Sequence, residues 1–86
     1  MNIEMSVKIT SAIQSLDCEV MTESLKTGVK FTISLDSEIK KIGMLTIPNE
    51  DDDALFCLFL DRKLIVVETI KKEEICEFIE KLKKLW

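Results

Sequence analysis

Four consecutive acidic residues in the middle of the chain form the one local cluster that could do chemistry. The cluster consists of Glu50, Asp51, Asp52 and Asp53. Adjacent carboxylates can bind a divalent cation or raise one another's pKa. The run lacks the glycine and the distant bidentate glutamate of a calcium-binding loop, so we expect no metal site. We interpret it as a solvated hairpin loop or as a contact for lysine and arginine residues of a partner.

Groups suited to other reactions are scarce. The sequence contains no histidine and no tyrosine, and its cysteines, Cys18, Cys57 and Cys76, are widely spaced. Histidine is the commonest general base and the commonest activator of a cysteine thiol. Only two glycines are present, so the phosphate-binding loops of nucleotide-binding folds are missing. We therefore expect buried thiols in a reducing compartment, no catalytic residue, no cofactor and no enzymatic activity.

The charge distribution limits the class of partner. The 86-residue chain has a formal net charge of −4, and the acidic excess falls within residues 1–70. Such a surface repels phosphate backbones, so direct nucleic-acid binding is not expected and a basic protein partner is favoured. No stretch approaches the roughly 18 apolar residues of a membrane span, and the first residues do not resemble a signal peptide. We expect a soluble, cytoplasmic protein without membrane contact.

Most of the chain has the alternation of apolar and polar residues that is typical of strands. It runs from Ile3 to Thr10 and, most clearly, from Val29 to Asp36, and a further strand is expected to end at Pro48. Residues 11–27 fit either a strand or a helix lying over the sheet. We favour the strand, because residues 24–28 resemble a turn that leads into the next strand.

Two later strands are apolar on both faces. Residues 54–60 and 64–67 flank the polar run at 61–63, which indicates a hairpin. A strand covered on one side should alternate, so both faces of this hairpin are expected to be covered.

The end of the chain has helical spacing. Its apolar stripe consists of Ile75, Phe78, Ile79, Leu82, Leu85 and Trp86. We therefore expect an α+β fold in one domain, residues 1–86, with strands mainly in 1–70 and a helix in 71–86. The antiparallel sheet would have about six short strands, either curled into a barrel or open with a partner on its second face.

Incomplete coverage of an open sheet favours a non-enzymatic protein-binding module. Its expected partner-binding residues are Asp36, Glu38, Glu50, Asp51, Asp52 and Asp53. The most specific version of this hypothesis follows from size and charge alone: a viral, anti-CRISPR-like inhibitor encoded by a phage or mobile element, which occludes a basic surface of a nucleic-acid-handling partner. The alternative is a homodimeric structural or accessory subunit whose apolar strands meet across a two-fold axis.

Overall fold

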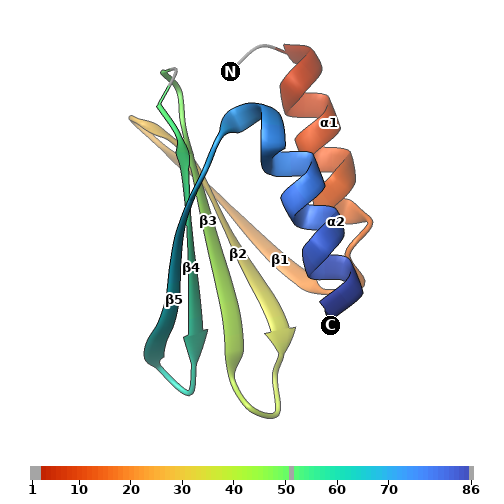
Figure 1. Cartoon of the computed structure of the whole chain (residues 1–86), viewed down its shortest axis with the longest axis vertical. Coiled ribbons are helices and arrows are strands. Elements are labelled where there is room, and N and C mark those ends of the chain that lie inside the picture. Colours follow the sequence, from red (N-terminus) through yellow and green to blue (C-terminus); the bar gives the residue numbers. More distant parts are fainter. Residues whose placement is uncertain (1–2, 51, 86) are drawn as a thin grey trace.

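The computed structural model describes residues 3–50 and 52–85 and shows an α+β fold with an open antiparallel sheet (Figure 1). The elements, in chain order, are α1 (Ile3–Gln14), β1 (Glu19–Leu25), β2 (Gly28–Asp36), β3 (Lys41–Pro48), β4 (Ala54–Leu60), β5 (Lys63–Ile70), the 3₁₀ turn η1 (Lys72–Glu74) and α2 (Ile75–Leu85). The strands lie in the order β1-β2-β3-β4-β5, so each one pairs with its neighbour in sequence.

Both helices lie on the same side of the sheet, and the core forms between them and that side (Figure 1). Ile9 and Ile13 of α1 are 1% and 3% exposed, while Ile75 and Ile79 of α2 are fully buried. The sheet contributes alternate residues of β2, β3 and β4. These are Phe31, Ile33, Leu45, Ile47, Ala54, Phe56 and Leu58. We call this side the helix-covered face and the other side the open face.

The predicted strand at residues 3–10 is wrong, because these residues belong to α1. Alternation from Ile3 to Ile9 was the argument for a strand, yet Ile9 and Ile13 with Leu16 also follow the spacing of a helical stripe, and they are the residues that become buried. Within residues 11–27, the helical alternative is correct up to Gln14 and the strand from Glu19. The sheet therefore has five strands rather than about six.

The hairpin and the C-terminal helix are confirmed. β4 and β5 pair around a tight turn at Asp61 and Arg62, whose φ angles of 47° and 69° lie in the left-handed region. Two such residues match the twist of the flanking strands. Ile75, Ile79 and Leu82 of α2 face the sheet as the spacing predicted, and Trp86 lies outside the described residues.

The expected cover on the second face of the sheet does not come from the described residues. The sheet stays open, and Leu55, Leu64 and Val67 are 42%, 52% and 54% exposed. Among the described helices, none is both long and apolar enough to cross a membrane.

Candidate interaction surface on the open sheet face

The strand register places a row of side chains across the open face. Met21 lies opposite Thr32, Thr32 opposite Met44, Met44 opposite Cys57 and Cys57 opposite Val67. Residues paired in an antiparallel sheet share a face, so this row crosses all five strands on one side. The row is polar at β2 and apolar from β3 to β5.

Neighbouring rows enlarge the apolar half of this face. Ile42 lies opposite Phe59, which in turn pairs with Leu64, while Leu55 pairs with Thr46 and Thr69. We name the resulting surface the open-face patch. It consists of Ile42, Met44, Leu55, Cys57, Phe59, Leu64 and Val67. Three of its members are more than 40% exposed and the others are partly buried, so it is a continuous apolar surface open to solvent.

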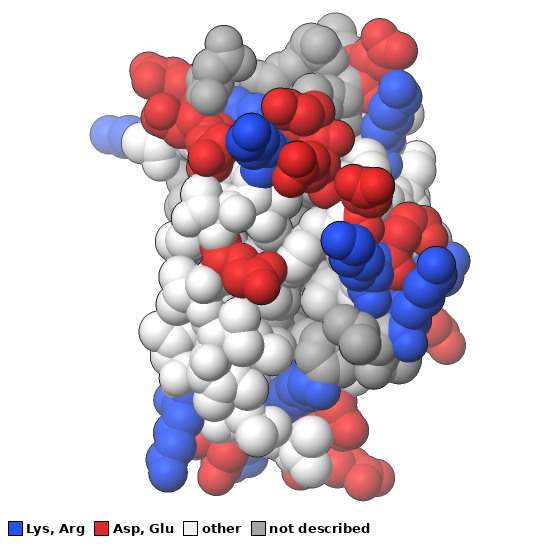
Figure 2. Space-filling view, in the orientation of Figure 1, with Lys and Arg blue, Asp and Glu red and all other residues white. Residues whose placement is uncertain are grey.

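The β5 edge extends this surface. A β-bulge on β5, opposite Leu58 and Phe59 of β4, leaves Ile65 without a register partner, and Ile65 is 51% exposed. Bulges are common at sheet edges, where they twist the edge away from further pairing. Figure 2 shows a wide surface over β5 with few charged side chains, bordered by charged groups at both ends of the sheet.

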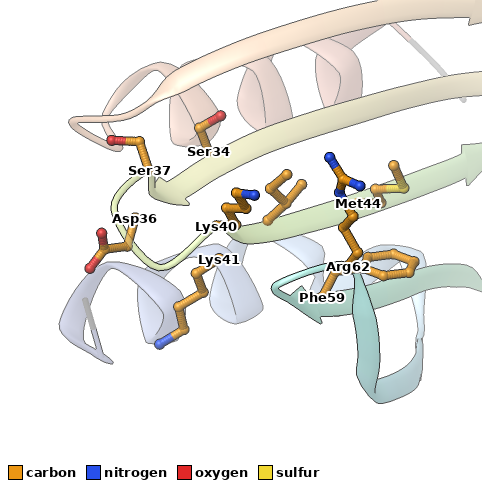
Figure 3. Close-up of a pocket in the computed structure, with 9 residues that line it drawn as sticks. Ser34, Asp36, Ser37, Lys40, Lys41, Met44, Phe59 and Arg62 are labelled. Atoms are coloured by element: carbon orange, nitrogen blue, oxygen red, sulfur yellow. The ribbon is translucent and has the colours of Figure 1, made fainter.

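A hollow of about 490 Å³ lies at one end of the patch, between the β2–β3 and β4–β5 turns. Its apolar lining comes from the patch residues Ile42, Met44 and Phe59, and its cationic groups include Lys40 and Arg62. We name it the basic hollow. Figure 3 shows Arg62 close to Phe59 and Met44, whereas Lys41 points away from them.

The turn geometry explains how these cations are held at the hollow. Lys40 has a φ of 53° and Arg62 a φ of 69°, and both stand at hairpin tips where side chains project outward. Lys40 Nζ lies 3.9 Å from Asp61 Oδ1, and both side chains are largely exposed, so this ion pair contributes little stability. Asp36 also lines the hollow and partly offsets its positive charge.

The sheet separates the acidic residues that were predicted to form one binding surface. Asp36 and Glu38 lie at the β2–β3 turn, where the Asp36 carboxylate accepts a hydrogen bond from the Glu38 amide at 3.1 Å. Glu50, Asp52 and Asp53 lie at the β3–β4 loop, at the opposite end of β3, and Asp51 is outside the described residues. The acidic loop is exposed and borders the patch at the end remote from the basic hollow.

The three cysteines lie in different parts of the fold, Cys18 between α1 and β1, Cys57 on β4 and Cys76 on α2. Over residues 3–50 and 52–85, no group of three or more cysteine or acidic residues could hold a metal ion. All three cysteines are free thiols that are only partly buried, so the prediction of buried thiols is wrong. Burial, together with the Asp17 carboxylate, raises the pKa of the Cys18 thiol, and a raised pKa lowers its nucleophilic thiolate fraction. Cys57 lies at the centre of the open-face patch, where its alkylation can report whether the patch is covered.

No family model matches the chain, and comparison with curated proteins and with solved structures found no match. The surface must therefore be interpreted from its own chemistry.

Reasoning from the sequence missed Lys40 and Arg62. Little in the sequence marks these two residues as part of a site, because lysine and arginine at hairpin tips are usually solvated. The run at residues 54–60, which is apolar on both faces, did indicate an apolar surface on the second side of the sheet.

Proposed function

We propose that this protein is a non-enzymatic binding module that engages a protein partner through the open-face patch. The observation that supports this proposal most strongly is the exposure of Leu55, Leu64 and Val67 on adjoining strands of one face. Contiguous exposed apolar surface of this kind usually marks an interaction site.

The position of the core supports the same proposal. The buried core cluster consists of residues from the helices, the α1–β1 connection and the helix-covered face of the sheet. Residues of the patch such as Met44 and Leu55 are not needed to complete that cluster, so solubility alone would favour polar residues there. Apolar residues at these positions are expected where a second surface covers them.

In this proposal the acidic residues help to orient the partner. They lie at both ends of the sheet and border the patch, a position suited to orienting a partner rather than to supplying most of the binding energy. Occlusion of a basic nucleic-acid-handling partner by a viral inhibitor stays a prediction from size and charge.

Site-specific photo-crosslinking in living cells tests the proposal. A photoreactive phenylalanine analogue is placed at Val67 in the patch or, as a matched control, at Val7 of α1. Both valines are exposed, at 54% and 59%, but Val7 lies on a helix. We expect a discrete protein adduct from position 67 and none from position 7. A second variant adds Leu64→Lys to the protein that carries the analogue at position 67. This substitution should abolish the adduct while leaving the circular dichroism spectrum unchanged.

Three results would contradict the proposal. The first is the lack of any protein adduct from position 67. The second is an equal yield from both positions, which would indicate random encounters. An adduct that persists after Leu64→Lys would likewise place the contact outside the patch.

A further inference from the structure

We infer that the partner covering the open-face patch is a second copy of this chain, packed face to face about a two-fold axis. The axis lies between the two sheets and perpendicular to the strands, so it reverses the strand direction from one copy to the other. This inference rests on the proposed function, because it names the occupant of the same surface.

The two ends of the patch differ in net charge. At one end, Lys40, Lys41 and Arg62 line the basic hollow together with one carboxylate, Asp36, so its lining is net positive, although Lys40 also pairs with Asp61. At the other end, Glu50, Asp52 and Asp53 form the exposed acidic loop. The eight residues of β3 join the two ends, a span of roughly 26 Å at the rise of an extended strand. The patch therefore presents a fixed order of acidic, apolar and basic groups.

This order determines which partner chemistry fits. A uniformly basic partner would be attracted to Asp52 and Asp53 but repelled by Arg62, and a uniformly acidic partner would meet the reverse. A suitable partner needs an apolar centre flanked by opposite charges at the same spacing in reversed order. A second copy, turned by the two-fold axis, has this arrangement by construction.

In this arrangement each acidic loop lies over the basic hollow of the other copy. The two contacts are equivalent, and both form at once because the same span separates loop and hollow in each chain. The apolar centres of the two sheets then pack at the usual spacing of about 10 Å between face-to-face sheets. Cys57, at the centre of each patch, becomes covered.

Paired charge reversals test the inference. One variant carries Lys40→Glu with Arg62→Glu, and the other carries Asp52→Lys with Asp53→Lys; all four positions are exposed. We expect the unaltered protein to sediment at about twice the 9.9 kDa of one chain. Each variant alone should dissociate at least about tenfold more readily, because like charges then meet at both ends.

An equimolar mixture of the two variants should restore the dimer. In the mixed pair, glutamates at the hollow of one copy meet lysines in the loop of the other, while the second contact keeps its original charges. Conservative pairs, Lys40→Arg with Arg62→Lys and Asp52→Glu with Asp53→Glu, serve as matched controls and should dimerise normally. Circular dichroism of each variant checks that folding is intact.

Alkylation of the cysteines gives an independent readout. Cys57 should react with a maleimide at least about tenfold more slowly in the dimer than in the charge-reversed variants. Cys76 of α2 lies away from the open face and should react equally in both, which provides an internal control.

The outcomes separate this inference from the proposed function. A monomeric mass at every concentration, with Cys57 reactive, overturns the inference. If the unaltered protein dimerises but the equimolar mixture of the two variants does not, the proposed contact between the acidic loop and the basic hollow is wrong. If the chain is monomeric yet position 67 crosslinks to a different protein, the proposed function stands without the inference. If position 67 gives no adduct at all, both fail.

Discussion

The ring of Phe56 on β4 packs edge to face against the ring of Phe78 on α2, with centroids 4.8 Å apart and an interplanar angle of 63°. Phe56 is 3% exposed and belongs to the buried core. This aromatic pair joins the centre of the sheet to the C-terminal helix.

A double-mutant cycle should detect this contact. Phe56→Leu and Phe78→Leu each keep an apolar side chain but remove the aromatic geometry. We expect the two rings to show a coupling energy of about 0.5 to 1.5 kcal/mol, measured by urea denaturation of the single and double variants. Phe59→Leu, on the open face, should show no coupling with Phe78→Leu. Strictly additive effects of the two core substitutions would contradict this prediction.

Gly28 should tolerate a methyl group less well than Gly43. A Cβ at Gly28 would overlap the carbonyl oxygen of Ile47, a main-chain atom that cannot move without disturbing the β2–β3 pairing. A Cβ at Gly43 would lie 3.0 Å from the ring of Phe56, which can adjust. We expect Gly28→Ala to lower the free energy of unfolding by about 2 to 3 kcal/mol and Gly43→Ala by less. Chemical denaturation compares them, and equal losses would argue against this explanation.

Replacing Lys72 should stabilise the protein. Among the described residues, Lys72 Nζ is the buried side-chain polar atom that has no hydrogen-bond partner. A buried polar group without a partner carries an uncompensated desolvation cost. We expect Lys72→Met to raise the free energy of unfolding by about 1 kcal/mol. Lys71→Met, at an exposed neighbouring position, is the control and should have little effect. A less stable Lys72→Met variant would show that the amine is solvated or paired in solution.

Cys18 should make stability fall in alkaline solution. Burial, and to a smaller extent Asp17, raises the pKa of the Cys18 thiol above its ordinary value of 9.0. As the pH rises through that ordinary value, the unfolded chain loses this proton before the folded chain does. Stability is therefore highest below it and declines above it. Cys18→Ser should remove this part of the alkaline decline in thermal unfolding, and Asp17→Asn should reduce it. Parallel declines in all three proteins would contradict the assignment.

The sequence predicted the strands with one covered face well. From Val29 to Asp36 the alternation matches the buried positions of β2, including Phe31 and Ile33. The spacing of α2 likewise predicted the buried residues Ile75 and Ile79. Both β2 and α2 bury a single side, so the spacing of their apolar residues indicates whether each is a strand or a helix.

The first helix was harder to predict because two periods overlap. Residues 3–9 alternate like a strand, and only the continuation through Ile13 and Leu16 reveals the helical stripe. The requirement for α1 arises from the sheet, whose covered face is too broad for α2 alone, and such tertiary demands override local pattern.

The sequence indicated that the sheet has a second apolar face, but not which charged residues border it. The two-faced run from Leu55 to Phe59 indicated that something must cover a second face. It could not indicate that β3 places Asp36 and Asp53 at opposite ends, because that separation follows from strand register and hairpin geometry.

The sequential pairing of the strands has a consequence for synthesis of the protein. Each hairpin from β1 to β5 can form as soon as its second strand has left the ribosome, since every pairing is local. The helix-covered face, including Leu45 and Phe56, must nevertheless wait for α2, which follows all five strands. During that interval the nascent sheet exposes apolar side chains on both faces, and we expect it to bind chaperones until α2 docks.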